Sequence, residues 1–327
     1  MSSVTTHPDC FRLLRLLARG KPLPGSVLAA GLGCSLDALP LRLREAEELG
    51  VTIAFESAEY RLQVPLDLID RDALADLLAP LRWPFQVEVL DECASTSTRL
   101  LQRTLEGAPH ASVVVCEHQI AGRGRRGAEW VSALGGSLAF SLLWRSGRRA
   151  GELSGLSLAV AVGVARALES VPGTAIGLKW PNDLLLGDRK LGGILIEMQG
   201  SSRAPSAVVV GVGINVKLPE NARSRINCPA ADLAAGGSAP SRTLLLARLL
   251  ENMAIVLDQF EREGFVSLRE EWLARHAWQD KPVALNVADR PVAEGIAVGI
   301  AEDGALLLRS SRGLERYHAG ELTLRRA

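Results

Sequence analysis

The pattern of hydrophobic residues changes twice along this 327-residue chain, and the changes predict separate structural regions. Residues 1–64 predict three short helices followed by two short strands, which is typical of a winged helix-turn-helix, although helix count alone fits a small helical interaction module equally well. Residues 65–82 predict a linker and a bridging helix. Residues 83–279 predict a mixed α/β domain, and residues 280–327 predict short strands that form a small β-barrel.

The middle region carries strand-like and helix-like runs that do not alternate regularly. This irregular order favours a mixed or antiparallel sheet with helices on one face over a doubly wound parallel sheet. The run from Leu153 to Glu169 is apolar on nearly every side, as expected for a helix that is buried against the sheet.

Composition limits the functions that the chain can perform. Thirty-seven Lys and Arg residues balance 37 Asp and Glu residues, so no overall positive charge drives binding to nucleic acid or to an anionic membrane. The five cysteines and five histidines are scattered, which argues against a disulfide framework and a zinc site. No signal peptide or long apolar run is found, so we expect a cytoplasmic protein with no membrane contact.

The segment Gly122–Gly127, with sequence GRGRRG, is the first candidate for ligand binding. Its glycines allow tight backbone conformations, and its arginines can close over a polyanion such as a nucleotide triphosphate. A solvated basic turn is the alternative interpretation of this segment alone. Trp130, just beyond it, can stack on a purine or can anchor the core.

The segment Lys179–Asp183, with sequence KWPND, is the second candidate. A lysine, an amide and a carboxylate around a Trp-Pro bend can bind phosphate oxygens together with a magnesium ion. Lys190 follows seven residues after Asp183. Because only five of the 37 basic residues are lysines, their presence here suggests sites that need a compact ammonium group.

Two weaker signals accompany these segments. Small residues in Gly211–Val216, with sequence GVGINV, let a ligand approach the backbone, although strand glycines often reflect only close packing, and Asn215 offers an amide. The hydroxyl cluster Ser95–Thr98 at a predicted helix start serves partly as an N-cap and can also bind a small polar head group.

In this order, the motifs GRGRRG, KWPNDL, DRKLGGIL and GVGIN resemble those of the biotin protein ligases, specifically the bifunctional type that also represses biotin synthesis genes. The resemblance covers nearly the whole chain, including GALLL at 304–308 and GELTLR at 320–325. It implies an α+β chain with an N-terminal winged helix-turn-helix, a central mixed-sheet catalytic domain similar to class II tRNA synthetases, and a C-terminal SH3-like β-barrel.

The resemblance also implies a reaction. In such enzymes the carboxylate of biotin attacks the α-phosphate of ATP to give biotinyl-5'-AMP, and a lysine of the biotin carboxyl carrier domain of acetyl-CoA carboxylase then attacks the mixed anhydride. Mg²⁺ is the implied metal, and a homodimer and operator DNA are further candidate partners. Two alternatives remain: a lipoate or octanoyl ligase or transferase of the same catalytic fold, and a DNA-binding repressor that uses the ligase site mainly as a sensor.

The resemblance assigns roles to individual residues. Lys190 is expected to contact the reacting carbonyl and phosphate, with Arg123 and Arg125 on the same side as catalytic residues, and Asp183 is expected near Mg²⁺. Ser97 stands where the family usually has asparagine. The biotin and adenylate pocket is expected to contain Ser95, Thr96, Ser97, Gln119, Arg123, Gly124, Arg125 and Lys190. The ATP side is expected to contain Trp130, Lys179, Asn182, Asp183, Asn215 and Arg325.

The third helix of the N-terminal module would be the one that reads DNA. A proline destabilises a helix beyond the first turn but has little effect within it. Pro40 lies within the first turn if Asp37 is the N-cap and beyond it if Ser35 is, so the sequence favours Asp37. Seven basic residues balance seven acidic residues in 1–65, whereas DNA-binding modules are usually basic. The sequence therefore predicts a winged helix that binds DNA weakly.

Overall fold

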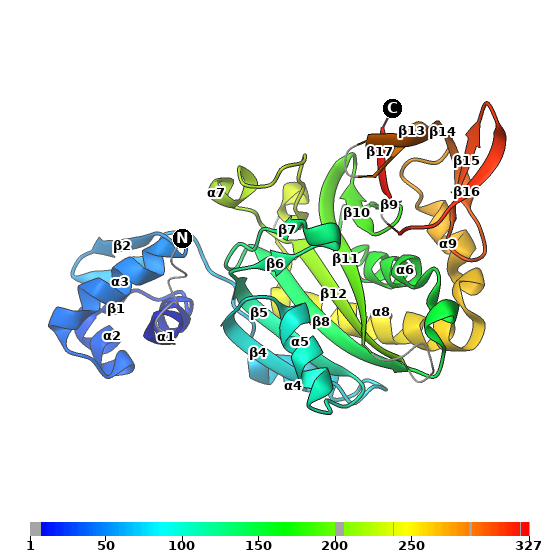
Figure 1. The fold of residues 1–327 in the computed structure, drawn as a ribbon. Coiled ribbons are helices and arrows are strands. Elements are labelled where there is room, and N and C mark those ends of the chain that lie inside the picture. Colours follow the sequence, from blue (N-terminus) through cyan, green and yellow to red (C-terminus); the bar gives the residue numbers. More distant parts are fainter. Residues whose placement is uncertain (1–7, 200–205, 238, 288–289, 321, 327) are drawn as a thin grey trace.

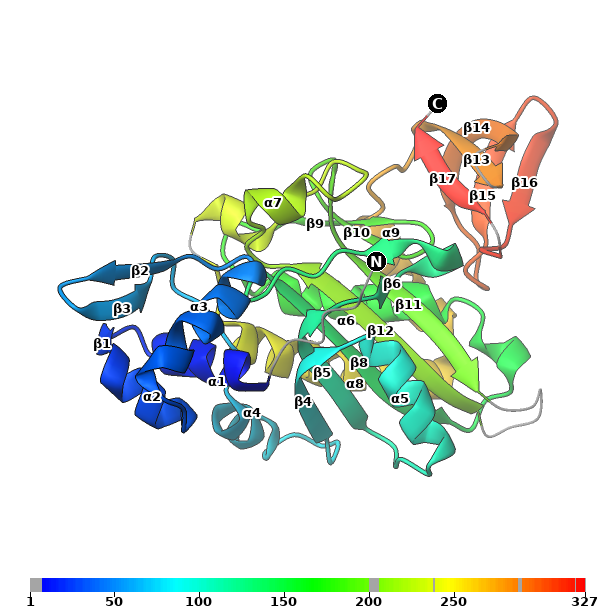
Figure 2. The same cartoon turned by 60° about the vertical axis from the view of Figure 1, so that its left-hand side comes forward.

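The computed structural model describes residues 8–199, 206–237, 239–287, 290–320 and 322–326. Its helices and strands form an N-terminal module on one side of the central sheet and a C-terminal β domain on the other (Figures 1 and 2). Among the described residues, no single helix is long and apolar enough to cross a membrane, and one bent pair, Gly25–Leu32 with Leu36–Glu48, passes that test on length and composition alone.

The N-terminal module contains three α-helices and a small antiparallel sheet of strand order β1-β3-β2 within the described residues. Leu13, Leu14, Leu28 and Leu39 form its core together with Phe11, and all are nearly inaccessible to solvent. The predicted helices and hairpin are therefore confirmed. The elements are α1 (Pro8–Leu17), β1 (Leu23–Pro24), α2 (Gly25–Leu32), η1 (Leu36–Ala38), α3 (Leu39–Glu48), β2 (Ile53–Glu56) and β3 (Glu59–Leu62).

The start of α3 explains how Pro40 is tolerated. Ala38 is the N-cap residue and Pro40 falls in the first turn, where a missing N–H costs little. The expected position of Pro40 is confirmed, but Asp37 as the N-cap was wrong, because Asp37 lies inside the short 3₁₀ turn η1 that Ser35 caps.

The central sheet has seven strands in the order β4-β5-β8-β12-β11-β10-β9 within the described part of the chain. Only the pairing of β4 with β5 is parallel, so the predicted mixed sheet is confirmed. The strands are β4 (Gln86–Cys93), β5 (Ser112–Gln119), β8 (Ser137–Ser146), β9 (Ile176–Lys179), β10 (Asp183–Leu186), β11 (Arg189–Gln199) and β12 (Ser206–Asn215).

Helices cover both faces of this sheet, which corrects the prediction of helices on one face. Val113 and Val115 of β5 belong to the main core with α6 (Leu156–Leu168) and α8 (Arg242–Glu263). Val114, which points to the opposite face, packs in a separate cluster with Leu100 of α5 (Thr96–Leu105). The short helix α5 lies on the face of the sheet opposite to α6 and α8 (Figure 1).

The C-terminal region folds as an antiparallel β domain with the strand order β16-β15-β14-β13-β17, which confirms the predicted β structure. Trp180, which is fully buried in the central domain, donates a hydrogen bond from its indole Nε1 to the Gly304 carbonyl at 3.1 Å and so ties the two domains together. The strands are β13 (Pro282–Val287), β14 (Arg290–Ile300), β15 (Leu306–Ser310), β16 (Gly313–Tyr317) and β17 (Thr323–Arg326).

The remaining elements connect these regions and frame the open face of the sheet. Asp70 caps the bridging helix by accepting backbone N–H groups of Asp72 and Ala73. A two-stranded hairpin is separate from the large sheets. The elements are α4 (Arg71–Leu78), β6 (Gly122–Arg123), η2 (Arg125–Gly127), β7 (Glu129–Trp130), η3 (Ala150–Leu153), α7 (Glu220–Arg223), η4 (Leu233–Gly236), η5 (Phe265–Leu268) and α9 (Arg269–Ala274).

A buried ion pair joins the linker to the central domain. Arg242, the first residue of α8, lies 2.7 Å from Glu117 of β5, and neither side chain is exposed. The other oxygen of Glu117 accepts the Ile69 N–H at 2.7 Å, and Arg242 donates to the carbonyls of Asp67 and Ser137. One buried pair therefore fixes the linker against the strand that leads to Gln119.

We expect Glu117→Gln to lower the free energy of unfolding by about 3 to 5 kcal/mol, because it leaves the Arg242 charge buried without its counter-charge. Urea unfolding measures this change. Glu56→Gln, at the exposed pair with Arg61, is the matched control and should cost no more than about 1 kcal/mol. A loss for Glu117→Gln as small as that of the control would contradict the account.

Candidate functional site

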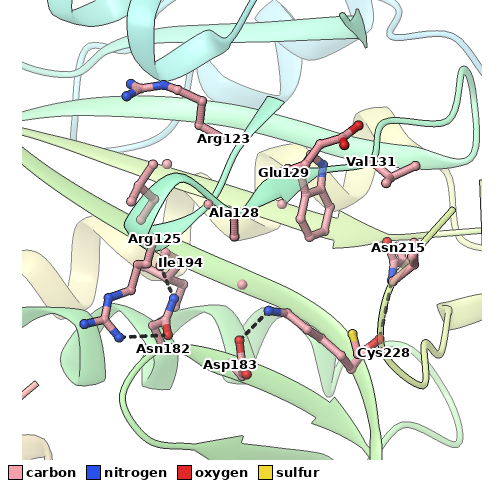
Figure 3. A pocket seen from close by; sticks show the side chains of 18 of the residues that line it. Arg123, Arg125, Ala128, Glu129, Val131, Asn182, Asp183, Ile194, Asn215 and Cys228 are labelled. Carbon is pink, nitrogen blue, oxygen red and sulfur yellow. Dashed lines mark hydrogen bonds and ion pairs between the residues drawn. The ribbon is translucent and has the colours of Figure 1, made fainter. Parts of the chain in front are cut away.

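A cavity of about 540 Å³ opens beside the hairpin β6-β7 on the α5 face of the central sheet. The structure brings all the site residues expected from the sequence to its wall, although they come from segments far apart in the chain. These residues are Ser95, Thr96, Ser97, Gln119, Arg123, Gly124, Arg125, Trp130, Lys179, Asn182, Asp183, Lys190, Asn215 and Arg325. Figure 3 shows part of this wall.

One end of the cavity is neutral and rich in hydroxyl groups. The Thr96 N–H donates to Gln119 Oε1 at 2.7 Å, so strand β5 holds the first turn of α5. The hydroxyls of Thr96 and Ser97 lie 2.8 Å and 3.0 Å from the hydroxyl of Ser141. Ser95 stands at the N-cap, yet its side chain makes no capping hydrogen bond.

Ser141 is a residue that the sequence interpretation missed. It is fully buried in β8 and links the two hydroxyls of the expected cluster. A signal was present in the sequence, because Ser141 is a lone hydroxyl within the otherwise apolar run Leu138–Trp144. A buried hydroxyl needs partners, and here the partners are site residues.

Glycines of β12 allow the cavity wall to pack closely. A Cβ at Gly211 would lie 2.6 Å from the Ser97 hydroxyl, and a Cβ at Gly213 would lie 2.6 Å from the Trp130 indole. Each distance is too short for any other residue type without movement. Trp130 Nε1 is buried and has no hydrogen-bond partner among the described residues. These glycines therefore make room for the Ser97 and Trp130 side chains, which is the close packing that was the alternative interpretation of GVGIN, and the predicted approach of a ligand stays a prediction.

The opposite end of the cavity holds a buried carboxylate between two ammonium groups. Antiparallel pairing places Asp183 of β10 opposite Lys179 of β9 and Gly193 of β11, and Lys190 lies three residues before Gly193. Lys190 Nζ lies 2.6 Å from Asp183 Oδ1, and Lys179 Nζ lies 3.1 Å from Asp183 Oδ2. Lys179 also lies over the Trp278 ring, 4.7 Å from its centroid. Figure 3 shows Asp183 on the cavity wall facing its ammonium partner.

Burial and charge act in opposite directions on this carboxylate. Burial alone would raise the pKa of Asp183, but the ammonium groups of Lys190 and Lys179 outweigh it and hold the pKa below the ordinary value of 3.8. Asp183 is therefore ionised at neutral pH and keeps both lysines in place.

Two amides are oriented by main-chain carbonyls. Asn182 Nδ2 donates to the Ile194 carbonyl at 2.7 Å, which turns its Oδ1 toward Arg125. Asn215 Nδ2 donates to the Ala231 carbonyl at 3.0 Å. Each amide is thus held in one orientation at the cavity wall (Figure 3).

The GRGRRG segment forms the outer wall through hairpin β6-β7, and we call Gly122–Trp130 the roof. Arg123 pairs with Glu197 of β11 at 2.8 Å. Arg125 donates to the carbonyls of Ala319 and Gly320 at 3.2 Å and 2.8 Å, so the C-terminal domain holds the roof. Burial, followed by the neighbouring Arg126 charge, lowers the pKa of Arg125 from its ordinary value, which is so high that the guanidinium stays charged.

Among the described residues, no group of three or more His, Cys, Asp or Glu side chains could hold a metal ion. Asp183 is the carboxylate nearest the lysine cluster, and both its oxygens contact ammonium groups. A metal at this end of the cavity would need ligands that a bound molecule supplies.

The pairing of Asp183 predicts a pH-dependent contribution to stability. Because its pKa is lowered in the folded state, the carboxylate stabilises the fold above the ordinary pKa of 3.8, and this contribution disappears as the pH falls below that value. We expect wild type and Asp183→Asn to differ most in urea unfolding near about pH 7 and to converge below about pH 4. A difference that does not change with pH would contradict this electrostatic role.

Comparisons with known proteins agree on one family. Residues 90–215 match the biotin/lipoate A/B protein ligase family, and residues 280–325 match the biotin protein ligase C terminal domain. The bifunctional ligase/repressor BirA of Salmonella typhimurium is 34% identical over 99% of both chains. A biotin--[acetyl-CoA-carboxylase] ligase of Paracoccus denitrificans is 34% identical over 66% of this chain and 91% of its own length.

A solved structure gives the same result for the fold. The biotin protein ligase from Aquifex aeolicus in complex with biotin and ATP superposes with a TM-score of 0.64 at 27% identity. The superposition covers 75% of this chain and all of the Aquifex chain.

Proposed function

The chain belongs to the biotin/lipoate A/B protein ligase family, and from this premise we propose that it is an ATP-dependent biotin--protein ligase. It joins the carboxylate of biotin to the α-phosphate of ATP, giving biotinyl-5'-AMP and pyrophosphate. It then transfers biotin to a lysine of the biotin carboxyl carrier domain of acetyl-CoA carboxylase, with release of AMP. The match to the biotin-specific C-terminal domain and the ligase names of the relatives support this assignment.

The observation that carries the proposal is the division of one cavity into a neutral end and a charged end. Biotin has a neutral ureido head group and an acidic tail. The buried hydroxyls of Thr96 and Ser97 with Gln119 offer hydrogen bonds to such a head group. The cations Lys190 and Arg125 lie where a carboxylate and a phosphate would react.

Asp183 and the contacts of the roof hold the cations of the charged end in fixed positions. Adenylation and transfer both build negative charge on the oxygens around the reacting phosphorus and carbonyl carbon. A fixed ammonium at Lys190 stabilises that charge without reorganisation, because Asp183 already holds it. Arg125 is oriented by carbonyl oxygens, which leave its positive charge uncancelled. No protein nucleophile is needed, since biotin's carboxylate and the carrier lysine attack in turn.

We propose that Mg²⁺ accompanies ATP and that Asp183 is a protein ligand to it. Mg²⁺ in such sites is commonly held by one or two carboxylates together with substrate phosphates. Asp183 would have to exchange one of its lysine contacts for the metal, because both of its oxygens contact ammonium groups in the described structure. When bound, the metal neutralises phosphate charge, while Lys179 and Asn182 are available to phosphate oxygens.

A lipoate or octanoyl ligase is the alternative within the family. An aliphatic or dithiolane tail offers no ureido-like hydrogen-bonding groups to the Thr96 and Ser97 side chains that line the cavity, whereas the head group of biotin does. The neutral polar end therefore favours biotin.

We propose the domain boundaries expected from the sequence: a winged helix-turn-helix at 1–64, a linker and bridging helix at 65–82, a catalytic domain resembling class II tRNA synthetases at 83–279, and an SH3-like barrel at 280–327. The three helices and the β2-β3 hairpin support the first, and the five-stranded sheet of described residues supports the last. We place the protein in the cytoplasm and propose that it forms a homodimer, as expected from the resemblance.

Repression is a second proposed role, because similar proteins carry the name bifunctional ligase/repressor. The N-terminal module is poorly suited to tight DNA binding. Arg42 of α3 is bound to Glu45 at 2.9 Å and lies 3.8 Å from Asp9, so its charge is already compensated. Leu36 in η1 and Leu41 in α3 are exposed. Ligation is therefore the main proposed activity, and a repressor that uses the site mainly as a sensor is disfavoured.

We expect Lys190→Ala to slow both adenylation and transfer by about 100-fold to 1,000-fold, because one preorganised charge is lost in both transition states. Lys190→Arg should restore activity only partly, since the planar guanidinium group places its N–H donors in different positions from those of the lysine ammonium group. The assay follows biotinyl-5'-AMP formation and the labelling of a carrier domain separately. Rates for Lys190→Ala within about threefold of wild type would contradict this role.

We expect only weak binding of the full chain to the DNA upstream of its own biotin synthesis genes, because the module is electrically neutral and Arg42 is paired. Fluorescence anisotropy with biotin and ATP present measures it. Tight binding that survives about 150 mM salt would show that this interpretation of the module is wrong.

A further inference from the structure

Arg123 and Arg125 are two residues apart in the roof, yet they make different kinds of contact. The Arg123 guanidinium faces both oxygens of Glu197, at 2.8 Å and 3.0 Å. Arg125 contacts main-chain carbonyls and the Asn182 amide, and its contacts within the described structure include no carboxylate at hydrogen-bond distance. Figure 3 shows Arg123 directed away from Asn182 and Asp183, whereas Arg125 reaches toward Asn182.

The register of β11 and β12 locates the Arg123 contact relative to the cavity. Gly193, Leu195 and Glu197 pair with Gly213, Gly211 and Val209, and all of these residues lie on the face that carries α5. The Trp130 side chain of the roof rests on Gly213. The Arg123 side chain is bound at Glu197, four residues along β11 from Gly193 and thus about 13 Å away.

The stretch between these two attachment points contains the neutral end of the cavity. Leu195 and Gly211 line the cavity there, and the Ser97 hydroxyl lies against Gly211. Arg123 and Trp130 are neighbours at the base of the hairpin, because Gly122 pairs with Trp130 and Arg123 pairs with Glu129, and their side chains reach the sheet on the two sides of this stretch. Trp130 fixes one side by packing, and Arg123 fixes the other by an ion pair.

The two arginines therefore contribute differently to the electrostatic potential of the cavity. Glu197 compensates Arg123, so this arginine adds little net positive potential to the cavity. Among the described residues Arg125 forms no such ion pair, and carbonyl oxygens orient it. A bound carboxylate or phosphate would therefore be attracted by Arg125 far more than by Arg123.

We propose that Glu197 is a positioning residue, which acts through Arg123 to hold the roof over the neutral end of the cavity, while Arg125 supplies the charge that faces the reacting groups. This inference rests on the proposed ligase function and assigns separate tasks within it. Arg123 is then an attachment of the roof rather than a catalytic residue, which differs from the role that the family resemblance implies. Glu197 slows ligand release and leaves the chemical step unchanged.

The test is a double-mutant cycle in the full chain with Arg123→Gln, Glu197→Gln and the combined variant. Each protein forms biotinyl-5'-AMP from biotin and ATP, and a chase with unlabelled biotin gives the rate at which the labelled adenylate is released. The adenylation rate constant is measured in parallel, and thermal unfolding reports any general loss of stability. Glu56→Gln, at the exposed Arg61 pair of the N-terminal hairpin, is the matched control.

We expect all three variants of the cycle to release the adenylate about twofold to fivefold faster, as suits a partly exposed ion pair. Their effects should be equal within about twofold, because either substitution removes the same contact. The adenylation rate constant should stay near wild type in Glu197→Gln and fall about 100-fold in Arg125→Gln. The control should match wild type in release.

Two results would overturn the inference. Arg123→Gln could slow adenylation at least about tenfold more than Glu197→Gln, which would mean that Arg123 touches the reacting groups. Alternatively, Glu197→Gln could release the adenylate no faster than the control. If wild type itself forms no adenylate, the proposed function fails separately, and hydrogen exchange of residues 122–124 in Glu197→Gln still decides whether Glu197 holds the roof.

Discussion

The buried carboxylate of Asp183, held between the ammonium groups of Lys179 and Lys190, is the interaction on which the charged end of the cavity depends. Two lysines in one low-dielectric cavity would repel each other without a counter-charge. The carboxylate makes their proximity stable, and the pairing of β9, β10 and β11 fixes all three side chains. Because Trp180 lies between Lys179 and Asp183 and bonds to Gly304, the same bend also attaches the C-terminal domain.

The rest of the site extends from this centre through rigid contacts. The C-terminal domain holds Arg125 by the carbonyls of Ala319 and Gly320, and the glycines of β12 give Trp130 and Ser97 room to approach the sheet. The neutral end and the charged end are thus parts of one sheet face. A ligand with a polar head and an acidic tail meets both ends at once, which is the geometry that joining biotin to a nucleotide requires.

Local patterns were sufficient to predict most of the strands and helices and the GRGRRG and KWPND segments, whereas strand β10 was not predicted and Gln119 and Arg325 were expected only from the family resemblance. Alternating apolar residues marked the strands, and motifs such as KWPND and GRGRRG marked chemically unusual loops. Contacts across strands could not be predicted, since they depend on register. Ser141 and Glu197 are distant in sequence from the groups they bind. Val114 packs against Leu100 of α5, on the face opposite to Val113 and Val115, and this packing depends on where α5 lies in the fold. The N-cap of α3 was missed because a 3₁₀ turn precedes it.

The central claim is that one cavity binds biotin at its hydroxyl end and activates it with ATP at its lysine end. Exchange of labelled pyrophosphate into ATP measures this activation directly and needs no acceptor protein. The account predicts exchange that requires biotin and is not supported by lipoate or octanoate. Exchange without biotin, or equal exchange with octanoate, would contradict it.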